Sequence, residues 1–534
     1  MTATPYPLEM ENVAIDGDGV RDFFWPVPVG SHKPMRDAAA AQLVAGLRET
    51  AGSDSLADQA FFLLAHHFFI DALSLFQASL VTDAFRQAGR EPLPPSRGRA
   101  LAAVLNETAP PAPSIIWHLQ NGPGAPRLLR APLRLARDLM MRDGIIRRRL
   151  SGPDYETEII ALGVDEVMAA HARSIDTPVT FRRPHLWFTP RETDLSLVDA
   201  PALDRAVEKG MAAFNAGYAA GSTCSPAFLE TYLREWLHPA MALIVAHLRD
   251  LETCGTPIPA QLWTGSGGNI WSRLLRHAVR QRGGRVVAHD HGAGSGQFTD
   301  EWFKNIVEFD TCDHFVSFTP TQAEGLAGHF RPDLLVRADT PTLEGLPAAA
   351  TKAPPVAGGP KDKPTVMVLS SFFFGDWVTY QAFMPDVPFL DWEARLLAKL
   401  KEWDFPTLYK PHPLIVTRSP MDMAPQFGAR ELNQPSEKVI HQADVLILPD
   451  PSSTAFATAL STDRPAVFAD FGLFKFRAPA RALLEERCAC VPVALDADNR
   501  PQPDWDALRN AILGAHEHTN TAYADSYYGA VYRT

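Results

Sequence analysis

Residues 408–413 read LYKPHP, and further along the chain residues 443–455 read ADVLILPDPSSTA. Each stretch is a short apolar run of strand type that ends at polar residues. The first ends at a lysine and a histidine between prolines, and the second ends at two serines and a threonine that begin a helix. An imidazole, hydroxyls and the unpaired N–H groups of a helix start suit an anionic group. The two stretches therefore predict a site for a nucleotide diphosphate or a sugar phosphate.

Strand and helix patterns alternate on both sides of these motifs. In the first half we expect strands and helices in turn over 261–264, 270–281, 285–288, 311–317 and 321–328. In the second half we expect the same alternation over 365–371, 391–402, 407–410, 436–442, 445–448, 454–461 and 466–469. Such alternation is typical of parallel sheets with sites at the carboxyl ends of their strands. The predicted fold class is α/β, with two Rossmann-like domains that face a cleft.

Additional helices are expected in the first half. Apolar residues recur at helical spacing over 55–89, 201–220 and 226–251, whereas residues 114–117 have the pattern of a short buried strand. Residues 341–364 are rich in proline, alanine and glycine, which favours a linker. We therefore predict an N-terminal acceptor-side domain over 1–340, a linker over 341–364 and a C-terminal donor-binding domain over 365–534. The last helices of the chain are candidates to pack back on the N-terminal domain.

Composition excludes some classes of function. The chain has 534 residues and a net charge of −12, which argues against a general nucleic-acid binder. Its five cysteines lack zinc spacing, and its N-terminus lacks a basic region followed by an apolar core, so we expect a cytoplasmic protein. The apolar stretch 61–81 contains His66, His67 and Asp71, which favours a buried helix over a membrane span.

A basic segment lies between Arg127 and Arg149. It combines eight arginines with interleaved leucines, isoleucines and a methionine pair, against two aspartates. One interpretation is a peripheral contact with an anionic membrane at its inner face, or with an anionic acceptor. The other is a solvated helix that packs by one face. The sequence leaves both open.

The motifs of the second half resemble a known superfamily. The run Lys410-Pro411-His412-Pro413, the strand over 445–448, Ser452-Ser453-Thr454 and the later run DRPAVF at 463–468 are similar to the donor domain of bacterial surface-polysaccharide transferases of the GT-B type. This resemblance covers roughly residues 365–471. In CDP-glycerol glycerophosphotransferases, sialyltransferases and Kdo transferases of this type, a His-Pro pair and a later Ser-Ser or Ser-Thr pair contact the donor phosphate.

The resemblance implies roles for individual residues of the donor side. His412 would neutralise or protonate the leaving phosphate, held in place by the prolines beside it. The remaining donor-binding candidates are Lys410, Pro413, Ser452, Ser453, Thr454, Ser370 and Ser371.

The acceptor side has two candidate bases. Residues 288–296 read AHDHGAGSG, which combines features of a Gln-His-Gly motif and of the acidic motif of sialyltransferases. Asp290 is favoured by the resemblance, whereas His291 has a pKa near ambient pH without assistance. Which of these two residues is the base stays open. A glycine-rich turn is expected to line the acceptor side with backbone donors, together with Gly292; its residues are Gly265, Ser266, Gly267 and Asn269.

The resulting functional hypothesis is an inverting glycosyltransferase. The resemblance implies a CMP-activated acidic sugar of the Kdo or nonulosonate class as donor, and a bacterial surface glycan, glycolipid or glycoprotein as acceptor. No Asp-x-Asp motif stands at an expected strand end, so we expect no metal site and no cofactor. Two other chemistries fit the same fold, a CDP-glycerol-type phosphotransfer and the 2-epimerisation of a UDP-sugar. A non-catalytic polysaccharide-assembly scaffold is the alternative of another class.

Overall fold

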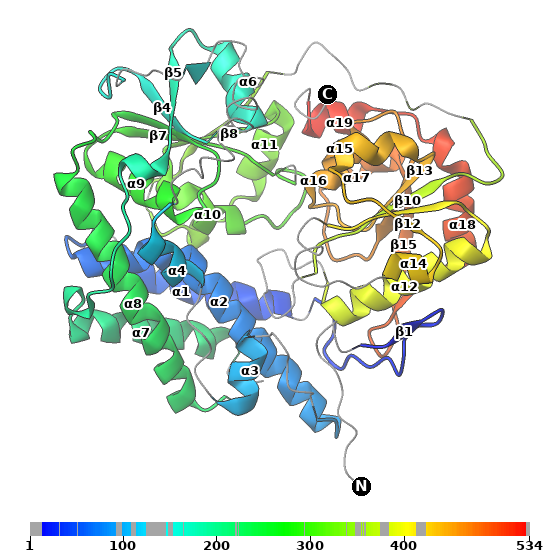
Figure 1. Ribbon diagram of the computed structural model, residues 1–534, viewed down its shortest axis with the longest axis horizontal. Helices are drawn as coiled ribbons and strands as arrows, with labels where there is room; N and C mark the ends of the chain where they lie inside the picture. Colours follow the sequence, from blue (N-terminus) through cyan, green and yellow to red (C-terminus); the bar gives the residue numbers. More distant parts are fainter. Residues whose placement is uncertain are drawn as a thin grey trace.

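The computed structural model shows two halves, each built on a seven-stranded sheet (Figure 1). It describes residues 13–30, 32–50, 52–91, 99–107, 114–123, 146–147, 153–163, 165–218, 222, 224–292, 294–337, 339–347, 354, 356, 359–373, 384–412 and 423–529. Most of the basic segment 127–149, and Pro413, lie outside these residues.

The first sheet is parallel throughout. Its strand order is β3 (Ile146–Arg147), β5 (Val179–Arg182), β4 (Ile159–Leu162), β6 (Gln261–Thr264), β7 (Arg285–His289), β8 (His314–Ser317) and β9 (Thr342–Gly345). Strands β6 and β7 match the expected segments, whereas β8 covers only the last four residues of the segment expected over 311–317. The expected linker at 341–364 is wrong at its start, because β9 occupies residues 342–345 and pairs with β8.

The second sheet has the strand order of a classical Rossmann fold. The order is β12 (Arg430–Glu431), β11 (Thr407–Lys410), β10 (Val366–Leu369), β13 (Val445–Leu448), β14 (Ala466–Asp470), β15 (Ala489–Leu495) and β16 (Pro501–Pro503), with β16 antiparallel. Counted along the chain from β10, the first six strands follow the order 3-2-1-4-5-6. The prediction of two Rossmann-like domains in a GT-B-like fold is confirmed.

Helices cover both faces of the second sheet because its central strands are apolar on both sides. Val366, Val368, Val445 and Ile447 pack with one cluster that includes α12 (Asp386–Glu402) and α18 (Trp505–Gly514). The alternate residues pack with helices on the opposite face, which are α15 (Ser436–Val439), α16 (Thr454–Leu460), α17 (Ala478–Arg487) and α19 (Ala522–Tyr527). The short helix α14 (Met423–Gln426) precedes β12. Such two-sided burial explains the unbroken apolar runs.

The first half carries the expected additional helices. They are α1 (His32–Glu49), α2 (Leu56–Gln87), α3 (Arg99–Asn106), α4 (Ser114–Asn121), α6 (Glu166–Ser174), α7 (Ala200–Gly217), α8 (Pro226–Thr253), α9 (Ile270–Gln281), α10 (Phe303–Val307) and α11 (Pro320–His329). The strand expected at 114–117 is wrong, because these residues begin α4, which packs one face on α8. Helix α2 is long and apolar enough to cross a membrane, but 72% of its most apolar window is buried in the protein.

The N-terminal hairpin belongs to the second half. Strands β1 (Ile15–Asp16) and β2 (Gly19–Val20) lie beside α12 (Figure 1). The fully buried Asp391 of α12 accepts a hydrogen bond from Val20 N–H at 2.9 Å and pairs with Arg395 and Arg500. The expected N-terminal domain therefore does not include residues 13–30, which cross to the other sheet.

Candidate functional site

Asp450 organises the donor-side tip, at the point where the second sheet changes direction between β10 and β13. Ser371 Oγ, just beyond β10, donates to Asp450 Oδ2 at 2.6 Å. Ser452 donates to Asp450 Oδ1 from its N–H at 2.9 Å and from its hydroxyl at 2.7 Å. Ligands of doubly wound sheets bind at such a switch point. The carboxylate thus fixes two of the predicted donor-binding serines in one cluster, although sequence reasoning did not identify Asp450 itself.

His412 and Lys410 lie at the neighbouring tip of β11. The imidazole of His412 is half-buried and meets the ring edge of Phe372, with centroids 5.3 Å apart. Burial lowers the pKa of His412 below its usual value, while Asp450 opposes this shift. Lys410 is buried, its Nζ donates to Pro411 O at 2.7 Å, and desolvation lowers its pKa. Ser370, also buried, donates to Ser371 O at 3.2 Å.

Ser453 has a structural role that the sequence only partly indicated. It is the N-cap of α16, whose hydroxyl accepts the N–H of Phe456 at 3.2 Å. Thr454 follows as an exposed first residue of this helix, which is only seven residues long. Ser452 therefore has its hydroxyl committed to Asp450, whereas Ser453 caps the helix.

We expect Ser453→Ala to lower the free energy of unfolding by about 1 kcal/mol, because it removes an N-cap acceptor. Urea denaturation measures this loss. Thr458→Ala is the matched control on the same helix, since the Thr458 hydroxyl returns only to the Thr454 carbonyl, and we expect it to leave stability nearly unchanged. Equal stability of the two variants would contradict the capping role.

On the acceptor side, Asp290 directly follows the last residue of β7. It is fully buried, and its Oδ1 accepts from Lys304 Nζ at 2.9 Å and from Gly292 N–H at 3.2 Å. Burial acts to lower the pKa of Lys304, but the carboxylates of Asp290 and Glu308 outweigh this effect, so the pKa of Lys304 is raised. The expectation that Asp290 meets the acceptor hydroxyl is therefore not supported by its placement, since the carboxylate is covered and paired with a cation.

His291 is placed differently from Asp290. Its side chain is 44% exposed, and its Nδ1 lies 3.9 Å from Oε1 of the buried Glu308. Partial desolvation lowers the pKa of His291, against the attraction of Glu308. Of the two predicted bases, His291 is the one that faces outward.

The glycine-rich turn after β6 holds the site together rather than offering free donors. Gly267 N–H donates to the Glu308 carboxylate at 2.8 Å, and Gly268 N–H donates to Ser266 Oγ at 3.1 Å. Asn269 caps α9, accepting the N–H of Trp271 at 3.0 Å. The prediction that this turn presents backbone donors to an acceptor is therefore not supported, because these groups already have partners within the protein.

A carboxyl group that sequence reasoning missed lies beside this turn. A Cβ atom on Gly265 would lie 2.6 Å from Asp165 Oδ2, so a larger residue there would displace this carboxylate. Asp165 follows β4 and begins α6, where its Oδ1 accepts Met168 N–H at 2.7 Å. Identification of the strand over 159–162 would have placed Asp165 at a strand end.

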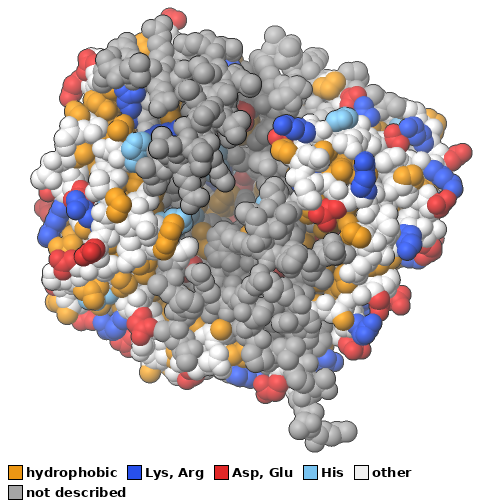
Figure 2. Space-filling view, in the orientation of Figure 1, with side chains coloured by type: hydrophobic (Ala, Val, Ile, Leu, Met, Phe, Trp, Pro, Cys, Tyr) orange, Lys and Arg blue, Asp and Glu red, His pale blue; other side chains and the backbone are white. Residues whose placement is uncertain are grey.

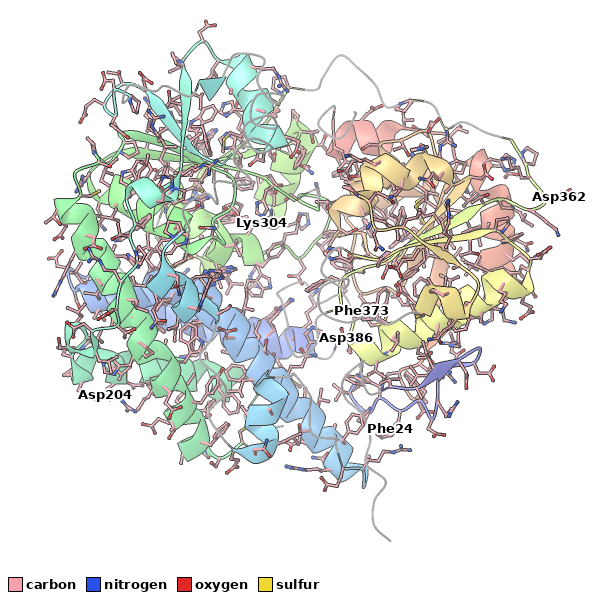
Figure 3. All side chains as sticks on the ribbon, in the orientation of Figure 1. Phe24, Asp204, Lys304, Asp362, Phe373 and Asp386 are labelled. Carbon is pink, nitrogen blue, oxygen red and sulfur yellow. The ribbon has the colours of Figure 1, made fainter. Side chains whose placement is uncertain are left out.

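The two tips meet where the loop after β7 crosses to the second half. A Cβ on Gly294 would lie 3.5 Å from Ser452 Cα, and Gln297 Nε2 donates to Pro451 O at 3.2 Å. Figure 2 shows a hollow between the two halves. Figure 3 places Lys304 on the side of the first half that faces this region, with Phe373 opposite it.

Helix α19 also reaches α11 of the first half, where the Thr319 hydroxyl donates a hydrogen bond to Ser526 O. Within the described ranges, no group of three or more His, Cys, Asp or Glu side chains is arranged to hold a metal ion.

Comparisons with known proteins identify no family. No protein-family model matches the chain, and no curated protein matches it. Among solved structures, MurG of Acinetobacter baumannii is similar over 70% of this chain and 98% of its own, with 12% identity and a TM-score of 0.29. The architecture described above rests on the order and pairing of the strands themselves.

Proposed function

We propose that this protein is an inverting, metal-independent glycosyltransferase that takes a CMP-activated acidic sugar, of the Kdo or nonulosonate class, and builds or modifies a bacterial surface glycan. The observation that carries the proposal is the contact between the two strand tips, with Gly294 of the acceptor side against Ser452 of the donor side. The Asp450 cluster and His412 share the donor-side edge of the second sheet. Their motifs resemble those of CMP-sugar transferases.

The chemistry would be a single displacement. The acceptor oxygen attacks the anomeric carbon while the bond from that carbon to the CMP phosphate oxygen breaks. The leaving group keeps the electron pair, and a base on the acceptor side takes the hydroxyl proton. His412 would stabilise or protonate the departing phosphate, and the serine hydroxyls of the Asp450 cluster would hold it.

The test is a nucleotide-release assay on the purified protein with CMP-Kdo, CMP-sialic acid, CDP-glycerol and UDP-sugars as donors. Release of CMP together with transfer to a glycan acceptor supports the proposal. Activity with UDP-sugars alone would overturn the donor assignment. A phosphodiester product would instead indicate a CDP-glycerol-type phosphotransfer. A free 2-epimerised sugar would indicate the epimerisation of a UDP-sugar.

Calorimetry with CMP and CDP addresses the scaffold alternative. Binding of CMP that weakens in His412→Ala supports a donor site. A wild-type protein that binds neither nucleotide would favour a non-catalytic assembly role.

A further inference from the structure

A second switch point lies in the first sheet, between β4 and β6. From β4 the chain passes to β5 on one side, and then to β6 and onward on the other, so the order is β5-β4-β6-β7. Connections that leave in opposite directions open a crevice outside the carboxyl ends of the two strands. Asp165 follows β4, and Gly265 follows β6. The close approach of Asp165 Oδ2 to Gly265 places a carboxylate at this crevice.

The charges around the crevice distinguish Asp165 from its neighbours. Asp290 is paired with Lys304 at 2.9 Å, and Glu308 is paired with Arg276 at 3.0 Å; all four side chains are buried. Asp165 is half-buried, and its Oδ1 accepts the Met168 N–H. Among the residues whose structure is described, no Lys, Arg or His forms a salt bridge with Asp165. Within that part of the chain, the charge of Asp165 is therefore not neutralised by a paired cation, unlike those of Asp290 and Glu308.

We propose that Asp165 is the base that accepts the proton of the acceptor hydroxyl, which makes the β4–β6 crevice the acceptor site. This inference rests on the proposed transferase function. The O–H bond of the acceptor breaks as its oxygen bonds to the anomeric carbon, and the proton passes to Asp165 Oδ2. The CMP phosphate departs with the electrons of the old bond on the donor side. The buried carboxylates of Asp290 and Glu308 act on this base electrostatically.

The electrostatic surroundings are consistent with this role. Desolvation raises the pKa of Asp165 to about 7; the Met168 N–H opposes the shift, and the carboxylates of Glu166, Asp290 and Glu308 add to it. A base must be deprotonated to act, so in the donor complex, where the bound phosphate keeps His412 protonated, kcat is expected to rise with pH through about 7. The cations paired with those two buried carboxylates are Lys304 for Asp290 and Arg276 for Glu308.

Asp165→Asn tests the inference with little risk to folding. Asparagine caps a helix about as well as aspartate, so α6 keeps its N-cap. We expect the turnover number with the donor identified by the nucleotide-release assay to fall by about 10² to 10⁴. We also expect CMP affinity, measured by calorimetry, to stay unchanged and the acidic limb of the pH–rate profile to disappear. Asp199→Asn is the matched control, because Asp199 caps α7 in the same way through Ala202 N–H at 3.0 Å.

The outcomes distinguish a wrong assignment of the base from a wrong proposal of the transferase function. If the wild-type protein binds CMP and transfers, but Asp165→Asn keeps the wild-type rate and acidic limb, the base assignment is overturned and the proposed function stands. Loss of activity in His291→Ala together with an active Asp165→Asn would also overturn it, in favour of His291. If the wild-type protein neither binds CMP nor transfers from any donor, both proposals fail together.

Discussion

Arg276→Met is expected to lower the free energy of unfolding of the first half by about 3–5 kcal/mol, because it leaves a buried carboxylate without its cation. Arg276 and Glu308 are both fully buried. The guanidinium also donates to Thr264 Oγ1 at 2.7 Å, at the end of β6. Urea denaturation measures the loss, and hydrogen exchange of peptides from β6 and α9 locates it.

A matched control lies one helical turn away. Arg280, also on α9, pairs with Asp313 at 2.9 Å, but both side chains are about 30% exposed. Arg280→Met should therefore cost less than about 1 kcal/mol. The double variant Arg276→Met with Glu308→Gln should recover part of the loss, since a neutral amide oxygen still accepts Gly267 N–H. Equal losses in Arg276→Met and Arg280→Met would contradict the account of a buried pair.

Much of the fold could be predicted because its central strands are buried on both faces. Strands 407–410 and 445–448 match β11 and β13 residue for residue. The run at 445–448 is apolar throughout, as expected of a central strand that is buried on both faces. The run at 114–117 was wrongly predicted to be a strand. Its apolar residues are too few to distinguish a strand from one face of a helix, and contact with α8 determines the outcome.

The candidate site was predictable in position but not in its internal bonding. Prolines, glycines and hydroxyl residues mark the strand tips, so the sequence located the donor edge at 410–412 and 452–454. It could not show that the Asp450 carboxylate accepts hydrogen bonds from both Ser371 and Ser452. Ser371 is 79 residues away in sequence, and its bond to Asp450 depends on the pairing of β10 with β13. The sequence also could not show that Asp290 is buried and paired with Lys304, because this pairing is a tertiary property.

His412→Ala is expected to reduce turnover by about 10² to 10⁴, because the leaving phosphate loses its acid. CMP binding, measured by calorimetry, should weaken but persist, since the Asp450 cluster remains. His441→Ala is the matched control, being an exposed histidine of the same half that lies before β13. Full activity of His412→Ala would remove His412 from the reaction.

The pH dependence of the wild-type enzyme follows from the order of the two pKa values. Burial holds the pKa of His412 below its usual value, while that of Asp165 is raised to about 7. In the free protein, the form with His412 protonated and Asp165 ionised is therefore a minor one. A bound phosphate favours imidazolium and raises the pKa of His412, so the productive form becomes more populated in the donor complex. We therefore expect the basic limb of kcat to lie at higher pH than that of kcat/KM. Coincident basic limbs in a full pH series would contradict a phosphate effect large enough to raise the pKa of His412 above that of Asp165.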